Sequence, residues 1–151
     1  MLLSKSCEYG LRALLYLAAA QSEGYVSLRD VSDRLDLSFT FLGKIFQQLT
    51  DAGLTVSQRG PSGGVALARD PATITLYEIV AVLDGEELFT ECVLGLPGCG
   101  QEKPCPLHRS WAQQRDQIEL LFRRANLADT AEETKAQNYR LTSLTNSAKN
   151  A

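Results

Sequence analysis

The sequence predicts a mainly α-helical fold with one small β-hairpin, followed by a long separate helix. Three observations indicate this: apolar residues recur at helical spacing near the start of the chain, two short runs of strand-forming residues flank a glycine-rich turn, and an apolar stripe begins at Leu107. Of the 151 residues, 44% are hydrophobic and 22% charged. These values are ordinary for a globular domain with an extension, and they exclude a largely disordered or fibrous protein.

Two short helices joined by a tight turn are expected in the first third of the chain. A first amphipathic helix, Cys7 to Gln21, should pack as core. After it, Ser27 can cap a short helix that ends near Leu35, and another helix runs from about Phe39 to Ala52, before Gly53. The last two helices form a helix-turn-helix, whose second helix enters the major groove of DNA.

The outward side of that second helix provides candidate DNA contacts. Its first turn should lead into the groove. The candidates are Ser38, Thr40, Lys44 and Gln47. Through Asp70 the chain carries seven basic and seven acidic residues, whereas the whole chain has a formal net charge of −3. The N-terminal part is therefore the better candidate for binding a polyanion.

A β-hairpin is expected directly after the helix-turn-helix. Residues 54–57 and 65–68 are typical of two short strands around a glycine-rich turn. The glycines permit positive φ, and a guanidinium in the turn can bind phosphate or enter a minor groove. An ordinary solvated hairpin is the alternative, but the place beyond a helix-turn-helix favours a DNA-binding wing. The candidate contacts there are Arg59, Gly60, Ser62 and Gly63.

A long helix is expected from Leu107 to about Ala125. Its apolar residues form a stripe that a small domain cannot easily cover. The stripe consists of Leu107, Trp111, Ile118, Leu121, Phe122 and Ala125. Such a stripe serves either as core packing or as a dimer surface, and the residues alone leave both readings open.

Three of the four cysteines lie in one segment, and the only histidine follows them. Cys92, Cys99, Cys105 and His108 offer the thiol and imidazole groups that iron–sulfur clusters and zinc prefer as ligands. The glycines and prolines between them suit a loop around an inorganic ligand better than they suit a core. A single cysteine is often a buried core residue, and we interpret the isolated Cys7 in that way.

The start of the chain resembles neither a membrane anchor nor a signal peptide. The apolar run from Leu14 to Ala20 is far shorter than the roughly 20 residues that a bilayer requires, and the ordered regions of a signal peptide are missing. We therefore expect a cytoplasmic protein, in which clustered cysteines bind metal or react in redox chemistry more often than they form structural disulfides.

Four features together resemble the Rrf2 superfamily of winged-helix regulators, typified by IscR, NsrR and RirA. They are the opening Ser4-Lys5-Ser6-Cys7-Glu8-Tyr9-Gly10, the wing Arg59-Gly60-Pro61-Ser62-Gly63-Gly64, the helix from Leu76 to Gly85 and the three-cysteine loop after it. The resemblance covers roughly residues 1–126 and implies a homodimer that binds a partly palindromic operator on double-stranded DNA. It also implies an iron–sulfur cluster in the loop, through which iron supply, redox state or nitric oxide changes DNA affinity.

The resemblance leaves the cluster type open. His108 follows Cys105 as in IscR-like members, whose two-iron two-sulfur cluster is held by three cysteines and a histidine. The separation of Cys92 from Cys99 departs from theirs, and in NsrR-like members a carboxylate at the place of Glu8, from the other subunit, completes a four-iron four-sulfur cluster. We favour the two-iron cluster with His108 over the four-iron cluster with Glu8, and Cys7 is the third candidate for the fourth ligand.

With the resemblance, the stripe from Leu107 is interpreted as a dimerisation surface. The predicted organisation is a winged helix-turn-helix domain (1–84), a cysteine-rich metal loop (85–106), a dimerisation helix (107–127) and a flexible C-terminal tail (128–151). In IscR-like chains a glutamate reads bases where Gly43 stands here, so specificity should fall more on Thr40, Lys44 and Arg59.

Two rival functions are weighed against this regulator. The first keeps the DNA-binding fold but places zinc or a thiol-disulfide pair in the cysteine loop. The second is an enzyme or an electron carrier. The sequence favours it least, because there is no Cys-x-x-Cys motif, no phosphate loop and no nucleophile with a paired base.

Overall fold

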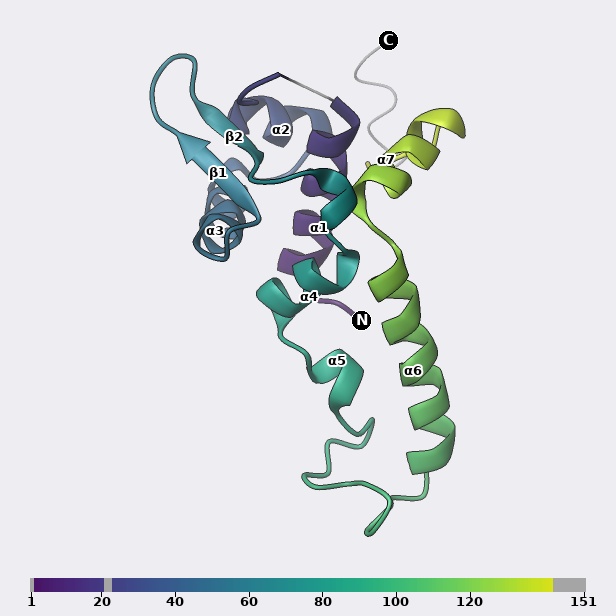
Figure 1. Cartoon of the computed structure of the whole chain (residues 1–151). Helices are drawn as coiled ribbons and strands as arrows, with labels where there is room; N and C mark the ends of the chain where they lie inside the picture. The colour runs from purple at the N-terminus through teal and green to yellow at the C-terminus, as the bar shows by residue number, and fades with distance from the viewer. Residues whose placement is uncertain (1, 21–22, 143–151) are drawn as a thin grey trace.

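The computed structural model describes residues 2–20 and 23–142. In these ranges the chain forms mostly helices and one antiparallel hairpin of two strands, as predicted (Figure 1). The elements are α1 (Lys5–Ala20), α2 (Leu28–Leu35), α3 (Phe39–Asp51), β1 (Thr55–Gln58), β2 (Gly64–Leu67), the 3-10 turn η1 (Pro71–Thr73), α4 (Leu76–Asp84), α5 (Glu87–Thr90), α6 (His108–Arg124) and α7 (Leu127–Ala136). Within the described ranges, the helices lack the length and apolar character needed to cross a bilayer.

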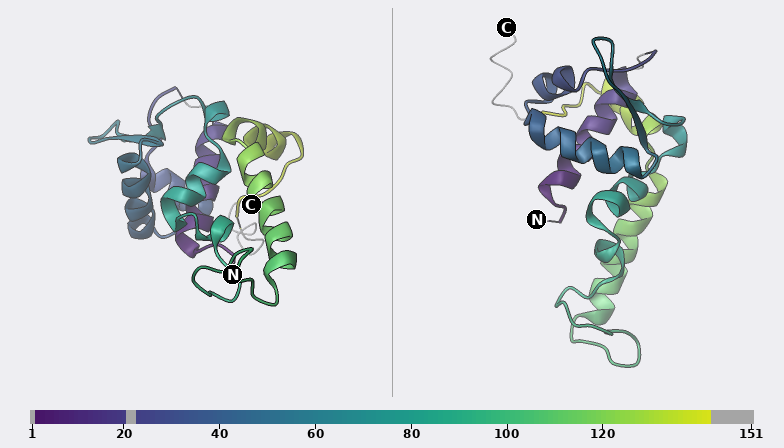
Figure 2. Two further views of the ribbon diagram at one scale, coloured as in Figure 1. Left: turned by 60° about the horizontal axis from the view of Figure 1, so that its bottom comes forward. Right: turned by 90° about the vertical axis from the view of Figure 1, so that its left-hand side faces the viewer.

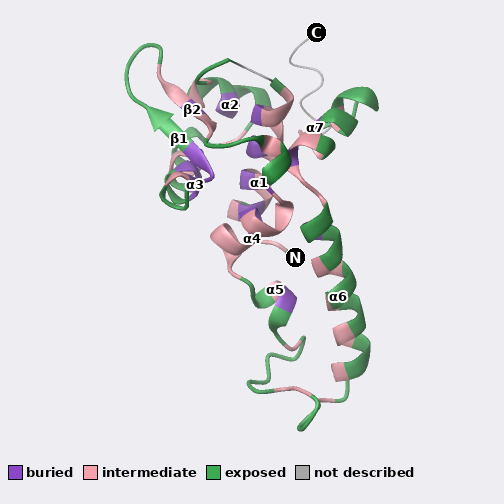
Figure 3. Cartoon of the chain, viewed as in Figure 1, coloured by how far each residue is buried: buried purple, intermediate pink, exposed green. Residues whose placement is uncertain are grey.

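Helix α1 lies at the centre of the helical core. It packs against α2, α3, α4 and α7, and against β2. The buried positions of these helices face one another in the upper part of the molecule (Figure 3). Fully buried side chains of this core include Leu14, Leu42, Ile79 and Leu127. Each such side chain contributes about 1.5–3 kcal/mol through removal of apolar surface from water.

The turn between α2 and α3 is closed by a buried serine. Ser27 caps α2 by accepting a hydrogen bond from the backbone N–H of Arg29. Asp36 ends the helix in the left-handed conformation, with φ 52°. Beyond it, the hydroxyl of Ser32 donates to the carbonyl of Leu37 at 2.5 Å, and the N–H of Leu37 donates back to the Ser32 carbonyl at 3.0 Å. These paired bonds fix the direction in which α3 begins.

The hairpin is attached to the core at its second strand. Val65 of β2 exchanges two backbone hydrogen bonds with Val26, at 2.8 and 2.9 Å. Gly64 makes this approach possible: its φ is 147°, and a Cβ atom there would lie 2.0 Å from the Val26 carbonyl oxygen. Any other residue at position 64 would therefore push the wing away from the segment that precedes α2.

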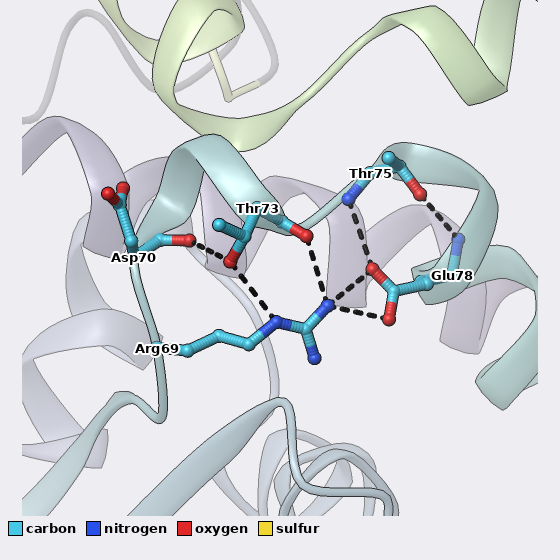
Figure 4. A network of polar contacts seen from close by, with 5 residues as sticks. All are labelled: Arg69, Asp70, Thr73, Thr75 and Glu78. Carbon is cyan, nitrogen blue, oxygen red and sulfur yellow. Dashed lines mark hydrogen bonds and ion pairs between the residues drawn. The ribbon is translucent and has the colours of Figure 1, made fainter.

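A polar network joins the exit of the hairpin to α4. Arg69 lies two residues beyond β2, and its guanidinium donates to both carboxylate oxygens of Glu78, at 2.5 and 2.6 Å, and to the carbonyl of Thr73 (Figure 4). Glu78 also accepts from the N–H of Thr75, whose hydroxyl accepts from the N–H of Glu78, which completes a capping box. The network sets how the hairpin and α4 lie relative to each other.

Helix α6 is anchored to the core at its C-terminal end. The N–H of Leu76 donates to the Ala125 carbonyl at 2.9 Å, and the N–H of Leu127 donates to the Ile74 carbonyl at 3.0 Å. From this junction α6 runs away from the core, and the cysteine loop lies at its far end (Figures 1 and 2). The predicted long helix is confirmed with slightly shorter bounds, because Leu107 serves as its N-cap.

Two short helices differ from the predicted organisation. Residues 128–136, which the sequence assigns to a flexible tail, belong to α7, and this part of the prediction is wrong. Asn126 caps α7, while Leu127 and Ala131 are buried against α1. Helix α5 lies within the segment predicted as a metal loop. Residues 143–151 of the predicted tail lie outside the described residues.

Candidate metal centre and DNA-binding surface

Three cysteine thiols converge in the loop between α5 and α6. The sulfur atoms of Cys92, Cys99 and Cys105 all lie within 4.8 Å of one another, and those of Cys92 and Cys105 are 3.4 Å apart. All three are free thiols of intermediate exposure. A three-thiol group at this separation can hold a metal ion or cluster, because each thiolate supplies one soft ligand atom.

Backbone turns bring the thiols together. The amide N–H of Gly95 donates to the Cys92 carbonyl at 2.9 Å, and that of Cys99 donates to the Leu96 carbonyl at 3.3 Å. Gly95 and Gly98 have φ values of 66° and 68°, which glycine adopts without steric cost. The glycines predicted to shape the loop therefore do so at two turns.

Backbone N–H groups also point at the sulfur atoms. The N–H of Leu94 lies 3.4 Å from the sulfur of Cys92, and the N–H of Cys105 lies 3.3 Å from that of Cys99. Hydrogen bonds of this kind stabilise thiolates, the form in which cysteine binds metal. Donation from the N–H groups of Leu96 and Leu94 lowers the pKa of Cys92 to about 7, whereas loss of hydration raises the pKa of Cys105.

His108 lies beside this group at the first residue of α6. Its Nδ1 is 3.5 Å from the sulfur of Cys99. The structure thus brings the three cysteines that the sequence nominates as ligands into one group, and His108 contacts one of them, Cys99. Three thiols, a neighbouring imidazole and N–H groups aimed at sulfur fit either zinc or an iron–sulfur cluster.

The fourth cysteine and the alternative ligand lie elsewhere. Cys7 is fully buried on α1 against Val80 and Phe89, and burial raises the pKa of its thiol to about 12. It is therefore a packed thiol, as predicted. Glu8 accepts a hydrogen bond from Lys5 Nζ at 2.7 Å. The predicted role of Glu8 is to bind the cluster of a second subunit. A single chain does not test that role, so it stays a prediction.

The predicted DNA contacts lie on α3 and the hairpin, on one side of the molecule (Figures 1 and 2). Ser38 is the N-cap of α3, and its hydroxyl accepts from the N–H of Phe41. Thr40, Lys44 and Gln47 are exposed. The residues of α3 that face inward are apolar, so this helix turns its polar side outward.

In the hairpin turn, the glycines have distinct roles. Gly60 has φ 107° and accepts a hydrogen bond from the N–H of Gly63 at 3.0 Å. A Cβ atom at Gly63 would lie 2.2 Å from the Gln58 carbonyl oxygen, so the turn requires glycine there. Arg59 and Ser62 are exposed beside them, where they are free of the core.

The structure adds a residue that sequence reasoning did not single out. The guanidinium of Arg29, on α2, lies 4.1 Å from the ring centroid of Phe39, the first residue of α3, which is 40% exposed. This pair places a cation next to the leading turn of α3. The signal available in the sequence was a basic residue in the first helix of a helix-turn-helix, which crosses the DNA backbone.

The fold and these two surfaces define a winged helix-turn-helix protein with a candidate metal centre. The family model for Rrf2, the iron-dependent transcriptional regulators, matches residues 3–133. The chain belongs to the Rrf2 family, as the sequence resemblance implies, and its role in transcription regulation and DNA binding follows from that membership.

The chain is also similar to proteins named as HTH-type transcriptional regulators. IscR of Photorhabdus laumondii is 34% identical over 118 residues, which are 78% of this chain and 71% of that protein. IscR of Yersinia pseudotuberculosis is 30% identical over 129 residues, 85% of this chain and 78% of that protein. These relatives are transcriptional regulators rather than enzymes.

Solved structures confirm the winged-helix fold. CymR, the global cysteine regulator of B. subtilis, has a TM-score of 0.75 at 31% identity, covering 87% of this chain and 97% of that one. T. potens IscR has a TM-score of 0.71 at 31% identity, covering 89% of this chain and 90% of that one.

Proposed function

We propose that the chain is a homodimeric, cytoplasmic DNA-binding regulator that senses iron, redox state or nitric oxide through an iron–sulfur cluster in the loop of residues 92–105. The convergence of the three cysteine sulfurs within 4.8 Å is the observation that carries this proposal. Cys92, Cys99 and Cys105 would hold the cluster, with His108 as the favoured fourth ligand and Glu8 of a second subunit as the alternative. A two-iron cluster is favoured over a four-iron one, and either supplies reversible oxidation and loss as a signal.

The uncovered apolar side of α6 supports a homodimer. Ile118 and Phe122 pack inward, near Phe89 of α5. Leu120 and Leu121 are 39% and 62% exposed. Apolar side chains on a helix that stands away from the core suit a second copy of the chain, and a two-fold dimer presents two α3 helices to two half-sites.

DNA recognition is proposed for α3 and the wing. The contacts would come from Ser38, Thr40, Lys44 and Gln47 of the helix-turn-helix and from Arg59, Gly60, Ser62 and Gly63 of the wing. The exposure of the long side chains among them supports direct contact with base edges or phosphates. Since Gly43 offers no side chain, base discrimination should depend mainly on Thr40, Lys44 and Arg59.

The proposed switch lies in the order of the cysteine loop. Val93, Leu94 and Leu96 are 48–50% exposed, so apolar burial contributes little to the position of the loop. We therefore expect the loop to be ordered when the three thiols bind a cluster and less ordered when they do not. We expect the ordered loop to bias how the two winged helices sit about the dimer helix, and thereby whether they match the operator spacing.

Native mass spectrometry of the anaerobically purified protein tests the proposal, because one spectrum reports subunit number and bound inorganic mass. We expect a dimer that carries a two-iron or four-iron cluster in each subunit. Cys92→Ser should lose the inorganic mass, whereas Cys7→Ser, the matched control, should retain it. A monomer, or a dimer without iron and sulfide after cluster reconstitution, would contradict the proposal.

A second candidate is a thiol-disulfide or zinc regulator on the same fold. The contact of 3.4 Å between the sulfurs of Cys92 and Cys105 favours it, since a small movement would bring them to bonding distance. An oxidised form of Staphylococcus aureus CymR is also similar, with a TM-score of 0.71 at 26% identity. Bound zinc in the native spectrum, or loss of two hydrogen atoms on mild oxidation with a linked Cys92–Cys105 peptide, would identify this candidate.

A further inference from the structure

One side of α6 carries three polar side chains in successive turns, all directed at the cysteine loop or its entry. His108, Trp111 and Arg115 are spaced by three and four residues, so they share a helix face. His108 contacts the sulfur of Cys99. The indole N–H of Trp111 donates to the Glu91 carbonyl at 2.9 Å. Nη1 of Arg115 donates to the carbonyls of Thr90 and Glu91, at 3.0 and 3.3 Å.

These two carbonyls belong to the end of α5. Thr90 is the last residue of that helix and Glu91 is its C-cap, so their carbonyl oxygens lack partners inside α5. A guanidinium is a suitable donor at this place, because the C-terminal end of a helix carries partial negative charge. The next residue is Cys92. Fixing the Glu91 peptide therefore fixes the backbone from which the Cys92 thiol extends.

Helix α5 needs such support from outside. A helix of four residues does not form on its own. Phe89, which is 3% exposed, attaches its middle to α6 through Phe122, with ring centroids 5.9 Å apart. Trp111 and Arg115 attach its end. Without them α5 would keep its apolar contact through Phe89. It would lose the hydrogen bonds that orient the backbone where the chain leaves the helix.

Arg115 is held at this site despite a cost. Within the described residues, its Nε is buried and has no hydrogen-bond partner. An unsatisfied buried donor is unfavourable, because it has lost its hydrogen bond to water. The same guanidinium is held in place by its hydrogen bonds to two carbonyls.

We propose that Trp111 and Arg115 are positioning residues for the metal centre. By holding the carbonyls of Thr90 and Glu91, they set the place of Cys92 relative to Cys99, Cys105 and His108. One face of α6 thus positions both ends of the donor set: directly at His108, and through the backbone at Cys92. The inference rests on the metal centre of the proposed function, and it adds two residues outside the ligand set.

Cobalt(II) binding to the reduced, metal-free protein tests the proposal, with Co²⁺ alone as the probe and sulfur-to-cobalt charge-transfer absorption as the readout. Trp111→Phe keeps an aromatic ring but removes the N–H, and Arg115→Met keeps a long, unbranched side chain but removes the donors. Each should weaken Co²⁺ affinity about 10- to 100-fold, as loss of an outer-shell partner does in other metal sites. Arg115→Lys, which keeps a charged donor, should lose less affinity than Arg115→Met.

Arg109→Met is the matched control. Arg109 is an exposed arginine of the same helix, next to His108 in sequence, so its loss removes the same charge without touching the α5 carbonyls. Its cobalt affinity should equal that of the wild type. Wild-type affinity in both Trp111→Phe and Arg115→Met would overturn the proposal, as would an equal loss in Arg109→Met.

A second measurement separates this proposal from the proposed function. Hydrogen exchange over residues 92–105 in the metal-free protein should be faster in Trp111→Phe and Arg115→Met than in the wild type or Arg109→Met, while exchange in α1 is unchanged. If the wild type binds no cobalt, the metal centre fails, and exchange alone decides whether these side chains position the loop. Unchanged exchange at residues 92–105 would overturn the positioning role.

Discussion

The helical core and the cysteine loop are stabilised by different interactions. In the core, side chains such as Leu14 and Leu42 are fully excluded from water. In the loop, Leu94 and its apolar neighbours are about half exposed, and the shape comes from backbone turns and from N–H groups directed at sulfur. Apolar burial stabilises a fold whatever is bound, whereas converging thiolates repel one another unless a cation lies between them. The core is therefore the constant part of the molecule and the loop the conditional part.

The largest expected effect is on the free energy of unfolding, compared between a substitution in the core and one in the loop. Leu42→Ala should lower the free energy of unfolding by about 2–5 kcal/mol, because it leaves a cavity among fully buried side chains. Leu94→Ala removes the same atoms from a half-exposed position and should change it by no more than about 0.5 kcal/mol. Urea denaturation of the metal-free proteins measures both. Equal losses would show that the loop is part of the core.

The next effect separates DNA reading from the loop. Arg59→Ala should weaken operator binding about 10- to 100-fold, as expected for one lost guanidinium contact of about 1–3 kcal/mol. A mobility-shift titration at fixed salt measures it, and dimer mass and bound iron should stay as in the wild type. Arg124→Ala, in the last turn of α6, is the control with the same charge change. Unchanged affinity in Arg59→Ala would remove the wing from DNA recognition.

A pH titration compares a thiol from each region. In the metal-free protein, alkylation of Cys92 should reach half its maximal rate near pH 7, because backbone N–H groups lower its pKa to about 7. Cys7, whose pKa burial raises to about 12, should not react until the protein unfolds. Peptide mapping after timed alkylation distinguishes the two. A midpoint for Cys92 near 9 would contradict the arrangement of the loop.

The same shift predicts a pH dependence of stability. The folded protein favours the Cys92 thiolate, which adds to the free energy of unfolding. This stabilisation is fully present above the unfolded pKa of 9.0 and is lost as the pH falls through about 7. Cys92→Ser should remove that dependence from the unfolding free energy.

The smallest expected effect concerns the polar network that joins the exit of the hairpin to α4. Arg69→Met should cost about 0.2–1 kcal/mol, because both Arg69 and Glu78 are 39% exposed and water screens their attraction. Thermal unfolding of Arg69→Met, Glu78→Gln and the double variant gives the coupling between the two. A loss as large as that of Leu42→Ala would make this network a main support of the fold.

Local signals made much of the winged helix predictable. Ser27 and Ser38 mark the starts of α2 and α3, and the apolar positions of each helix recur with its own period. The wing was predictable because Gly63 and Gly64 meet steric conditions that only glycine satisfies. These signals act within a few residues of the position they determine.

The remaining features depend on contacts between distant segments. Helix α5 is too short to show a period, and its stability comes from α6. Helix α7 carries a cap at Asn126, but its polar composition outweighed that signal, and only packing on α1 explains it. Trp111 was counted in an apolar stripe, whereas its indole N–H bonds a carbonyl 20 residues away in the chain. The clustering of the cysteines predicted a site, but not which atoms meet there.

The backbone bonds at the junction of α6 and α7 give the long helix the mechanics of a lever. The pivot lies where the N–H of Leu76 bonds the Ala125 carbonyl and the N–H of Leu127 bonds the Ile74 carbonyl. With 17 residues, the arm from the pivot to His108 is about 25 Å long, at 1.5 Å per residue. A rotation of about 5° at the pivot then displaces the loop by about 2 Å, given that arm length. Conversely, if the proposed switch operates, thiols that draw together by a few ångströms would turn the winged helix only by a few degrees. We then expect the operator to discriminate between orientations that differ by that little.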